Sequence, residues 1–268
     1  MLTNPRSPRV RGIAKLAGRR ARRETGTYLL EGPQAVREAL EFAAGSVIDV
    51  YATEQALERN RDIRTLLADA GLRVELAAGD VIDAMADTVT PQGVVAVARQ
   101  APADLDDVFA ARPRLVAICH EIRDPGNLGT IIRAADAAGA GAVVLTGDTV
   151  DPYNPKVVRS TTGSLFHVPV AFGAELPDVA ARAKGAGLRV LAADIGGDDL
   201  LAARGELASP VAWLFGNEAR GLDDAALSEA DRALRLPIYG RAESLNLATA
   251  ASVCLYESAF AQHVADVQ

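Results

Sequence analysis

The feature that most constrains this chain is an alternation of short apolar runs with longer stretches of helical periodicity. The apolar runs of the first part are residues 28–31, 47–52, 73–76 and 93–98. Those of the second part are residues 115–119, 142–145, 168–171, 188–192, 211–215 and 233–236. Strands separated by helices are typical of an α/β fold and, in the second part, favour a parallel sheet. Ligands of such sheets bind beyond the carboxyl ends of the strands, so we expect functional residues directly after the apolar runs.

The two series of runs predict two domains. A chain of 268 residues, 49% of them apolar, is long enough to bury two modest cores. We expect a first domain at residues 26–99 and a second at residues 114–268. The intervening residues 100–113 contain two prolines and several aspartates, which indicates a linker with at most a short helical turn.

The composition argues against a membrane, secreted or metal-binding protein. No apolar stretch approaches the roughly 18 residues of a membrane-spanning helix, and no apolar segment follows the N-terminal arginines as in an export signal. Cys119 and Cys254 lie far apart in apolar runs, which indicates buried thiols in a reducing compartment. No Cys/His cluster has a metal-ligand spacing. We therefore expect a cytoplasmic protein without a metal.

Positive charge is concentrated at the N-terminus. Eight of the 28 basic residues precede the first acidic residue, Glu24, although the formal net charge of the whole chain is −7. Residues 1–25 are therefore expected to form a basic arm, in which Arg19, Arg20, Arg22 and Arg23 are candidates for contact with RNA phosphates. Charge alone is equally consistent with a solubilising disordered tail.

The first unusual segment is HEIRDPGNLGTIIR at residues 120–133, directly after an apolar run. Asn127 is expected to cap a helix, and Arg133 would then project from near its start, where a guanidinium can bind a phosphate or ribose oxygen. Alternatively, Asn127 is only a cap and Arg133 a solvated side chain. The chain has no G-x-G-x-x-G and no G-x-x-x-x-G-K-[ST], which argues against dinucleotide binding and nucleotide hydrolysis.

Two further segments follow later runs. LFGNEARGL at residues 214–222 places Glu218 between Gly216 and Gly221, which suits either a ligand loop or an ordinary tight turn. LPIYGRAESLN at residues 236–246 leads into a helix that is expected to begin near Ser244 as its cap. Asn246 would lie close to the free N–H groups of the first turn, where capping and ligand contact are compatible.

Together, these segments resemble the three ordered motifs of the SpoU/TrmH family of RNA ribose methyltransferases. The first is similar to N-x-G-x-x-x-R, the second to G-x-E-x-x-G and the third to P-x-x-x-x-x-x-S-L-N. The resemblance implies a parallel α/β domain with a deep trefoil knot, which general folding rules would not predict. In the first domain, Glu31, Gly32 and Pro33 belong to a segment similar to a small RNA-binding domain related to a ribosomal protein.

The resemblance also implies roles for individual residues. S-adenosylmethionine would be bound bent in the knot, mostly by main-chain groups, at Leu145, Thr146, Gly216, Leu236, Leu245 and Asn246. Arg133 would contact the target phosphate and the ribose 2′-hydroxyl, favouring the alkoxide as negative charge develops. The residues that would hold it and the ribose in place are Asn127, Glu218, Ser244 and Asn246. Arg159 is similar to a further basic position of family members and is a candidate for contact with RNA, although a helix-surface arginine would look the same.

The resemblance therefore predicts an S-adenosylmethionine-dependent enzyme that methylates a ribose 2′-hydroxyl of structured RNA and forms a homodimer through the knot region. Small residues after Asn246, including Ala251 and Ala259, could pack either the dimer or the internal core. Ribosomal RNA, of the large subunit in particular, is favoured over transfer RNA because a separate N-terminal domain precedes the catalytic one. The alternatives are a non-catalytic RNA-binding protein of the same fold and a nucleotide-dependent oxidoreductase or hydrolase.

Overall fold

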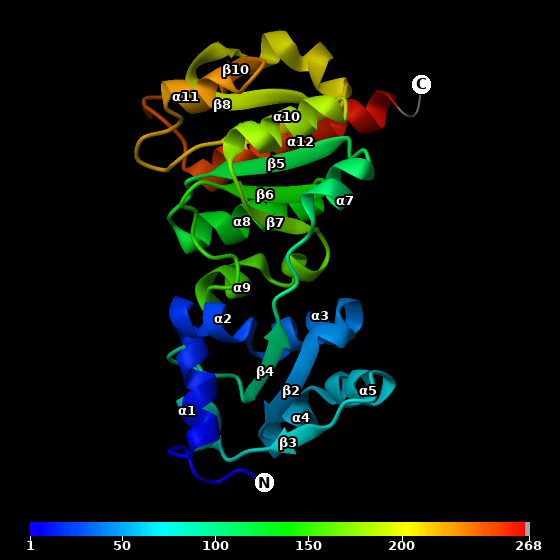
Figure 1. Ribbon diagram of the computed structural model, residues 1–268, viewed down its shortest axis with the longest axis vertical. Coiled ribbons are helices and arrows are strands. Elements are labelled where there is room, and N and C mark those ends of the chain that lie inside the picture. Colours follow the sequence, from blue (N-terminus) through cyan, green and yellow to red (C-terminus); the bar gives the residue numbers. More distant parts are fainter. Residues whose placement is uncertain (266–268) are drawn as a thin grey trace. The chain divides into compact units, whose positions relative to one another are not determined.

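The structure is a computed structural model that describes residues 1–265. Its internal contacts divide the chain into two units, each with its own sheet (Figure 1). Unit 1 comprises residues 1–101 and 151–167, and unit 2 comprises residues 102–150 and 168–268. Residues 151–167 thus pack with unit 1, although they lie in the middle of the segment expected to form the second domain.

Unit 1 is built on a four-stranded mixed sheet of order β1-β4-β2-β3. The strands are β1 (Thr27–Glu31), β2 (Val47–Ala52), β3 (Val74–Leu76) and β4 (Val94–Arg99). The central β4 runs antiparallel to β1 and β2, while β2 and β3 are parallel. The carboxyl ends of β1 and β2 therefore lie at the same edge, where β4 begins.

Helices cover both faces of this sheet. They are α1 (Pro8–Ala14), η1 (Lys15–Ala17), α2 (Arg19–Thr25), α3 (Pro33–Phe42), η2 (Ala44–Ser46), α4 (Glu54–Arg59), α5 (Arg61–Asp69), α6 (Gly79–Met85), α9 (Pro155–Thr161) and η3 (Ser164–Phe166). Side chains alternate along β1, so Tyr28 and Leu30 pack with α3, α4 and α5, whereas Leu29 packs with α1 and α6. The apolar alternation of the sequence therefore builds two buried layers.

Residues 1–25 are part of this fold and not a disordered tail. Val10, Ile13 and Leu16 are buried against α6 and the sheet. Arg22 is 1% exposed, and its guanidinium contacts the Asp151 carboxylate at 2.7 Å. It also donates to the main-chain oxygen of Leu16. The basic segment is thus held by apolar burial and by an internal ion pair.

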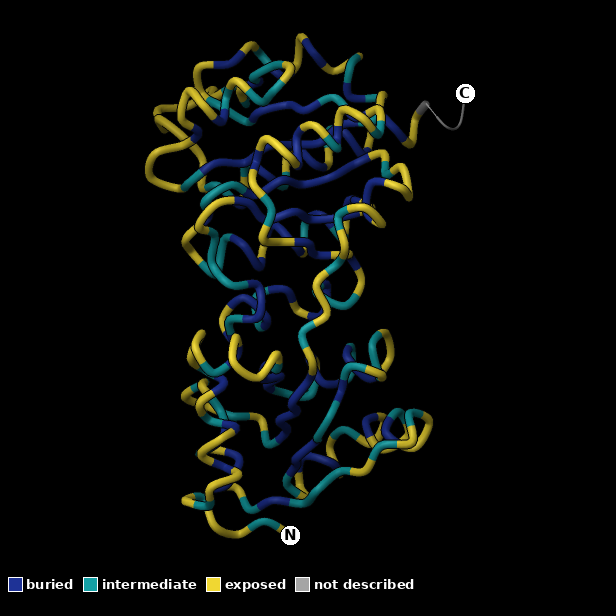
Figure 2. The backbone as a smooth tube through the Cα atoms, in the orientation of Figure 1, coloured by how far each residue is buried: buried dark blue, intermediate teal, exposed yellow. Residues whose placement is uncertain are grey.

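Unit 2 is built on a six-stranded parallel sheet of order β10-β8-β9-β5-β6-β7. The strands are β5 (Leu115–His120), β6 (Ala142–Thr146), β7 (Val170–Ala174), β8 (Arg189–Asp199), β9 (Val211–Phe215) and β10 (Arg232–Arg235). The strands and the parallel sheet expected from the sequence are confirmed. Figure 2 shows that the central strands are buried along most of their length.

The helices of unit 2 lie on opposite faces of its sheet. They are α7 (Leu105–Ala110), α8 (Pro125–Ala137), α10 (Leu176–Gly185), η4 (Leu200–Ala208), α11 (Asp224–Ser228) and α12 (Leu247–Ala265). The side chains of α7, α10 and α11 share one core with β5 and its neighbours. On the other face, α8 and α12 pack against each other and against β5.

The C-terminal helix is anchored by buried polar contacts. The indole N–H of Trp213 in β9 donates to Ser258 Oγ at 2.9 Å, and both side chains are buried. The amide of Gln262 donates to the main-chain oxygens of Arg114 and Ser209. A buried donor without a partner costs about 1–3 kcal/mol, so these contacts fix α12 on the sheet. Among residues 1–265, no helix is long and apolar enough to cross a membrane.

Candidate active site

The three segments singled out in the sequence lie at carboxyl ends of strands in unit 2. The first follows β5 and the second follows β9, and these two strands are neighbours, with Cys119 paired to Phe215. The third follows β10, which is separated from β9 by β8. Residues 236–246 have no regular structure and lead from the end of β10 to the start of α12.

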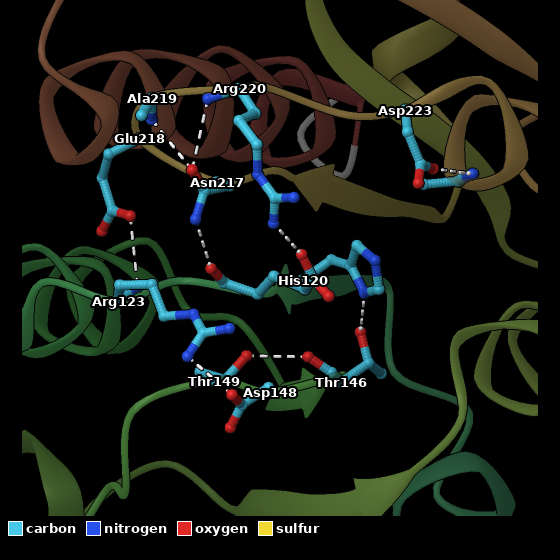
Figure 3. A network of polar contacts seen from close by, with 12 residues as sticks. His120, Arg123, Thr146, Asp148, Thr149, Asn217, Glu218, Ala219, Arg220 and Asp223 are labelled. Atoms are coloured by element: carbon cyan, nitrogen blue, oxygen red, sulfur yellow. Dashed lines mark hydrogen bonds and ion pairs between the residues drawn. The ribbon is translucent and has the colours of Figure 1, made fainter.

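A chain of side-chain hydrogen bonds joins all three segments. Asn246 Nδ2 donates to Asn127 Oδ1 at 3.0 Å, and Asn127 Nδ2 donates to Glu218 Oε1 at 3.2 Å. Glu218 also accepts from the main-chain amide of Arg123 at 3.1 Å (Figure 3). It accepts from the main-chain amide of Asp124 at 3.0 Å as well. Its carboxylate therefore ties the turn after β9 to the loop before α8.

These contacts keep Glu218 ionised. Burial of its carboxyl group by itself would raise the pKa, but the hydrogen bonds from the amides of Arg123 and Asp124 and from the Asn127 side chain outweigh it. The pKa of Glu218 is therefore lower than usual. An ionised Glu218 accepts hydrogen bonds and donates none, which suits a group that positions its neighbours.

The helix caps differ from those expected. Asp124 caps α8, because its Oδ1 accepts from the main-chain N–H of Asn127 at 2.8 Å. Asn127 lies inside the first turn, and its side-chain amide is consequently available for Glu218 and Asn246. At the third segment Asn246, and not Ser244, caps α12, with its Oδ1 accepting from Ala248 N and Thr249 N. In both helices, the cap is the Asp or Asn residue that directly precedes the first helical residue.

Arg133 and Ser244 stand outside this hydrogen-bonded chain. Arg133 is exposed on α8 and, within residues 1–265, makes no hydrogen bond or ion pair. Six residues of an α-helix correspond to about 600° of rotation, so Arg133 and Asn127 point roughly 120° apart. Ser244 is exposed in the 236–246 segment and contacts none of Asn127, Glu218 and Asn246 by a hydrogen bond in the described chain. The guanidinium of Arg133 is thus available to a ligand.

Several further polar residues of the site were not anticipated. Asn217 Nδ2 donates to the main-chain oxygen of Glu121 at 2.8 Å, and Glu121 has a positive φ of 53°. The carboxylate of Glu121 contacts Arg220 at 2.6 Å, and Arg123 contacts Asp148 at 2.6 Å (Figure 3). Positive φ is costly for a non-glycine residue, and such positions are concentrated at functional sites. Except for Asp148, these residues lie in the first two of the three segments. A single sequence does not show which side chains of different loops pair.

The residues expected to hold a cofactor carry no charged side chain. Leu145 and Thr146, at the end of β6, have buried side chains, and Thr146 Oγ1 is hydrogen-bonded to His120 Nδ1. Gly216 is buried, and a Cβ there would lie 2.6 Å from the Gly221 main chain, so the turn after β9 requires glycine. Leu236 is half-buried, while Leu245 is 41% exposed at the end of the irregular segment.

The two cysteines take no part in the site chemistry. Both are free and buried, as the sequence predicts. Burial and the nearby carboxylate of Glu218 raise the pKa of Cys119 above its usual value, and burial raises the pKa of Cys254 to about 12. Their thiols are therefore protonated near neutral pH and are poor nucleophiles.

The candidate RNA-binding arginines differ in how far they are buried. Arg19, Arg20 and Arg23 are exposed on α2 and line one surface hollow together with Glu24. Buried Arg22 is used inside unit 1, which corrects the expectation that it contacts RNA. Arg159 is half-buried on α9, where its guanidinium contacts Glu31 at 3.0 Å and Asp87 at 3.1 Å. Its pairing to two carboxylates was not expected.

A parallel α/β unit with polar loops after adjacent strands, accompanied by a second unit with its own sheet, defines a two-domain α/β protein with a ligand site at the carboxyl ends of its strands. The model of the SpoU rRNA methylase family matches residues 114–256, and a model described as RNA 2′-O ribose methyltransferase substrate binding matches residues 29–103. The chain therefore belongs to the SpoU rRNA methylase family and is an RNA 2′-O-ribose methyltransferase. The resemblance inferred from the three motifs is confirmed.

Relatives with similar sequences and structures cover nearly the whole chain. The 23S rRNA (guanosine(2553)-2′-O)-methyltransferase RlmP of Bacillus subtilis is 35% identical over 95% of this chain and 97% of its own length. The structure of the SpoU methyltransferase AviRb from Streptomyces viridochromogenes, in complex with S-adenosylmethionine, has a TM-score of 0.82, 31% identity and coverage of 97% and 100%. An S-adenosylmethionine-bound rRNA methyltransferase from Sinorhizobium meliloti has a TM-score of 0.81, 32% identity and coverage of 96% for both chains.

Proposed function

We propose that this enzyme transfers the methyl group of S-adenosylmethionine to one ribose 2′-hydroxyl of 23S ribosomal RNA. The observation that carries the proposal is the hydrogen-bonded chain of Asn246, Asn127 and Glu218, which joins the three family motifs at one end of the sheet. The relatives named above act on 23S rRNA or bind S-adenosylmethionine, and they align over almost the full chain. Ribosomal RNA is the preferred substrate for this reason, and transfer RNA is the alternative to be tested beside it.

The groups available at the site fit S-adenosylmethionine. Thr146 ends β6 and Gly216 follows β9, the two strands on either side of β5, and neither residue places a charged side chain there. Leu236 and Leu245 add apolar surface, and Asn246 adds an amide at the start of α12. Uncharged main-chain donors and acceptors beside leucines suit a nucleoside with a short polar tail. When bound, the cofactor supplies a sulfonium-activated methyl group, so no metal or redox centre is needed.

The protein contributes positioning and electrostatic stabilisation. Arg133 contacts the phosphate and the 2′-oxygen of the target nucleotide, where its charge favours the alkoxide as the proton leaves. A guanidinium is a poor base, so its main effect is electrostatic and any proton relay is secondary. Asn127, Glu218 and Asn246 are positioning residues that hold the loops around the ribose, and Ser244 contacts the substrate from the irregular segment. Misplacement by about 1 Å can reduce a rate roughly 100-fold.

The irregular 236–246 segment forms the proposed trefoil knot. It leaves β10 at the edge of the sheet, and its last residue, Asn246, bonds to Asn127 after β5. The chain thereby passes from one edge of the sheet to the ends of central strands before α12 packs on β5 and β9. This path is the one expected if the C-terminal part is threaded through a loop.

The enzyme works as a homodimer that packs through α12, and we place it in the cytoplasm with its ribosomal RNA. Ala248, Ala251 and Ala259 are buried, so the small-residue face serves the internal core. The side chains of Val253, Tyr256, Phe260 and Val264 are exposed instead and recur along one side of α12. Phe260 is 62% exposed, and its ring packs against that of Tyr256. A second copy that covers this stripe would remove its apolar area from water.

The decisive experiment is transfer of labelled methyl from S-adenosylmethionine to unmodified 23S rRNA and, in parallel, to unmodified transfer RNA. The products are mapped by sequencing that is sensitive to ribose methylation. We expect one methylated 2′-oxygen in 23S rRNA and its loss in Arg133→Ala. Methylation of transfer RNA alone would replace the proposed substrate. Cofactor binding without transfer to either RNA would favour a non-catalytic RNA-binding protein.

A further inference from the structure

Unit 1 contains a pocket of about 220 Å³ at the carboxyl end of β1, where α3 begins. Its walls come from the start of α3, the 86–93 segment before β4, and α9. Polar lining residues include Gln34, Thr88, Thr90 and Gln92. Apolar lining is provided by Val94, Val95 and Val158, among others. Clefts for drug-sized ligands are usually roughly 300–1,000 Å³, so this pocket suits a single small ring system.

The pocket is a built feature, because the buried carboxylate of Glu31 holds two of its walls together. The Glu31 side chain is 3% exposed, and its Oε1 accepts from Arg159 Nη1 on α9 at 3.0 Å. Its Oε2 accepts from the main-chain N–H of Thr88 in the 86–93 segment at 3.0 Å. Arg159 also contacts Asp87. Glu31 therefore fixes both α9 and the 86–93 segment at the end of β1.

The charge of the lining discriminates between ligands. Two carboxylates, Glu31 in the lining and Asp87 outside it, pair with the single guanidinium of Arg159, so this cluster carries a net negative charge and disfavours a phosphate. An uncharged ring with N–H donors and carbonyl acceptors is better matched. Gln92 is exposed, and its amide makes no hydrogen bond within residues 1–265. A side-chain amide offers both a donor and an acceptor, which is what the edge of a nucleobase requires.

We propose that this pocket takes one unstacked base of the RNA substrate, bound between α3, the 86–93 segment and α9. The inference rests on the proposed function, since it assigns a specific contact to the unit that matches the substrate-binding family model. Sequence-specific proteins usually read RNA at unpaired nucleotides, whose bases are splayed out, stacked on flat groups and hydrogen-bonded at their edges. Gln92 reads the base edge, and the Arg159 guanidinium, held by Glu31 and Asp87, packs against the ring.

The surroundings accommodate the rest of the nucleotide. A second hollow of about 550 Å³ lies on the other side of Pro91 and Gln92, which line both cavities. Arg59, exposed at the end of α4, lines this second hollow together with Asp83 and provides a positive charge for the phosphate of the bound nucleotide. Val89, which is 97% exposed in the 86–93 segment, presents an apolar surface to a neighbouring base.

The test compares two exposed threonines of unit 1. Thr90→Tyr places a ring at the pocket, whereas Thr65→Tyr places the same ring on α5, away from the pocket lining. Gln92→Ala removes the proposed base contact without adding bulk. With labelled S-adenosylmethionine and unmodified 23S rRNA, we expect Thr90→Tyr and Gln92→Ala to raise KM for RNA roughly tenfold, the usual contribution of one bound base. The kcat and the affinity for S-adenosylmethionine stay at wild-type values, and Thr65→Tyr is unchanged.

A second readout does not depend on methyl transfer. A benzophenone amino acid at position 89, which is 97% exposed between the lining residues Thr88 and Thr90, should crosslink to one unpaired nucleotide of the 23S rRNA transcript, and the same probe at position 65 should not. Wild-type KM values for both pocket variants, or identical crosslinks from positions 89 and 65, would overturn the pocket assignment. Absence of methyl transfer by the wild-type protein would instead contradict the proposed function, and the crosslink would still decide whether the pocket holds a base.

Discussion

Asn246 donates a hydrogen bond to Asn127, which lies 119 residues earlier in the chain. The donor Nδ2 of Asn246 and the acceptor Oδ1 of Asn127 are 3.0 Å apart. Each asparagine also has a second task. Asn246 caps α12, and Asn127 donates to Glu218. The start of α12, the start of α8 and the turn after β9 are consequently fixed relative to one another. The site geometry thus depends on two side-chain amides whose donor and acceptor atoms are both used.

The first prediction concerns Asn127. Asn127→Ala removes the acceptor for Asn246 and the donor to Glu218, so the three loops lose their direct connection. We expect kcat for RNA methylation to fall roughly 100-fold, because small displacements of positioning residues are costly, while the affinity for RNA changes little. Single-turnover kinetics with saturating RNA would measure this. Asn4→Ala, which removes only a local contact to the Arg6 amide, is the matched control, and equal rates for the two variants would refute the positioning role.

The second prediction concerns the charge of Glu218. Its pKa is lower in the folded protein than in the unfolded chain, so its stabilising contribution is present above the unfolded pKa of roughly 4.3. That contribution is lost as the pH falls through the lower folded pKa. We expect Glu218→Gln to reduce the free energy of unfolding at pH 7 by no more than about 1 kcal/mol, since the carboxylate is partly solvent-screened. The difference from wild type should shrink below pH 4 in urea titrations, and a constant difference would disprove an ionic contribution.

Much of the fold could be predicted because it follows from local apolar patterns. The runs that form β5, β6 and β9 are continuous and buried on both faces. Their burial could be predicted because nearly every residue in them is apolar. Asn127, Glu218 and Asn246 lie in the segments that follow β5, β9 and β10, and their roles were inferred from the resemblance of these segments to the family motifs. The helix caps were misassigned by two or three residues, because Asp124 and Asn127, or Ser244 and Asn246, are equally good capping residues and local sequence does not choose between them.

What could not be predicted depends on contacts between distant residues. Arg22 and Arg23 are adjacent and chemically identical, yet one is buried against Asp151 and the other is exposed. Asp151 lies 129 residues away along the chain, within the segment that packs with unit 1. The pairing of Arg159 with Glu31 is equally remote. No pattern in the N-terminal segment distinguishes an arginine that completes a core from one that faces solvent.

The third prediction uses this adjacent pair. Arg22→Ala leaves the Asp151 carboxylate buried without its partner, and it also removes donors to the main-chain oxygens of Leu16 and Ala17. Loss of one member of a buried ion pair typically costs about 3–5 kcal/mol. We expect chemical denaturation to show a loss of this size for Arg22→Ala and a change within about 0.5 kcal/mol for Arg23→Ala. Equal destabilisation by both variants would show that the ion pair between Arg22 and Asp151 does not stabilise this segment.

The fourth prediction concerns the exposed arginines of α2. Replacing Arg19, Arg20 and Arg23 together by glutamine removes three positive charges from one surface and leaves buried Arg22 in place. If all three contact RNA phosphates, the slope of log Kd against log salt should decrease by roughly 2–3, because a protein with fewer phosphate contacts releases fewer counterions when it binds. Deleting residues 1–23 would confound this measurement by removing the buried side chains of α1.

The control for this patch is a triple glutamine variant of Arg61, Arg64 and Arg73, which are also exposed in unit 1. It changes the net charge by the same amount at a different surface. S-adenosylmethionine binding, measured by calorimetry, should be unaffected in both triple variants. A salt slope that falls equally in both would indicate a general effect of charge, and an unchanged slope in the α2 variant would mean that this helix does not contact RNA.

The fifth prediction tests the exposed stripe on α12. Phe260→Glu places a charge in the centre of the apolar surface formed by Val253, Tyr256, Phe260 and Val264, so burial of this surface against a second copy becomes unfavourable. We expect analytical ultracentrifugation to show a dimer for wild type and a monomer for Phe260→Glu. The circular dichroism spectrum of the variant should match that of wild type, which would show that the subunit is still folded. Val89→Glu, which adds the same charge at an exposed apolar residue of unit 1, should remain dimeric. A monomeric wild-type protein, or a dimeric Phe260→Glu variant, would contradict packing through α12, because a glutamate at that position cannot be buried without a partner for its charge.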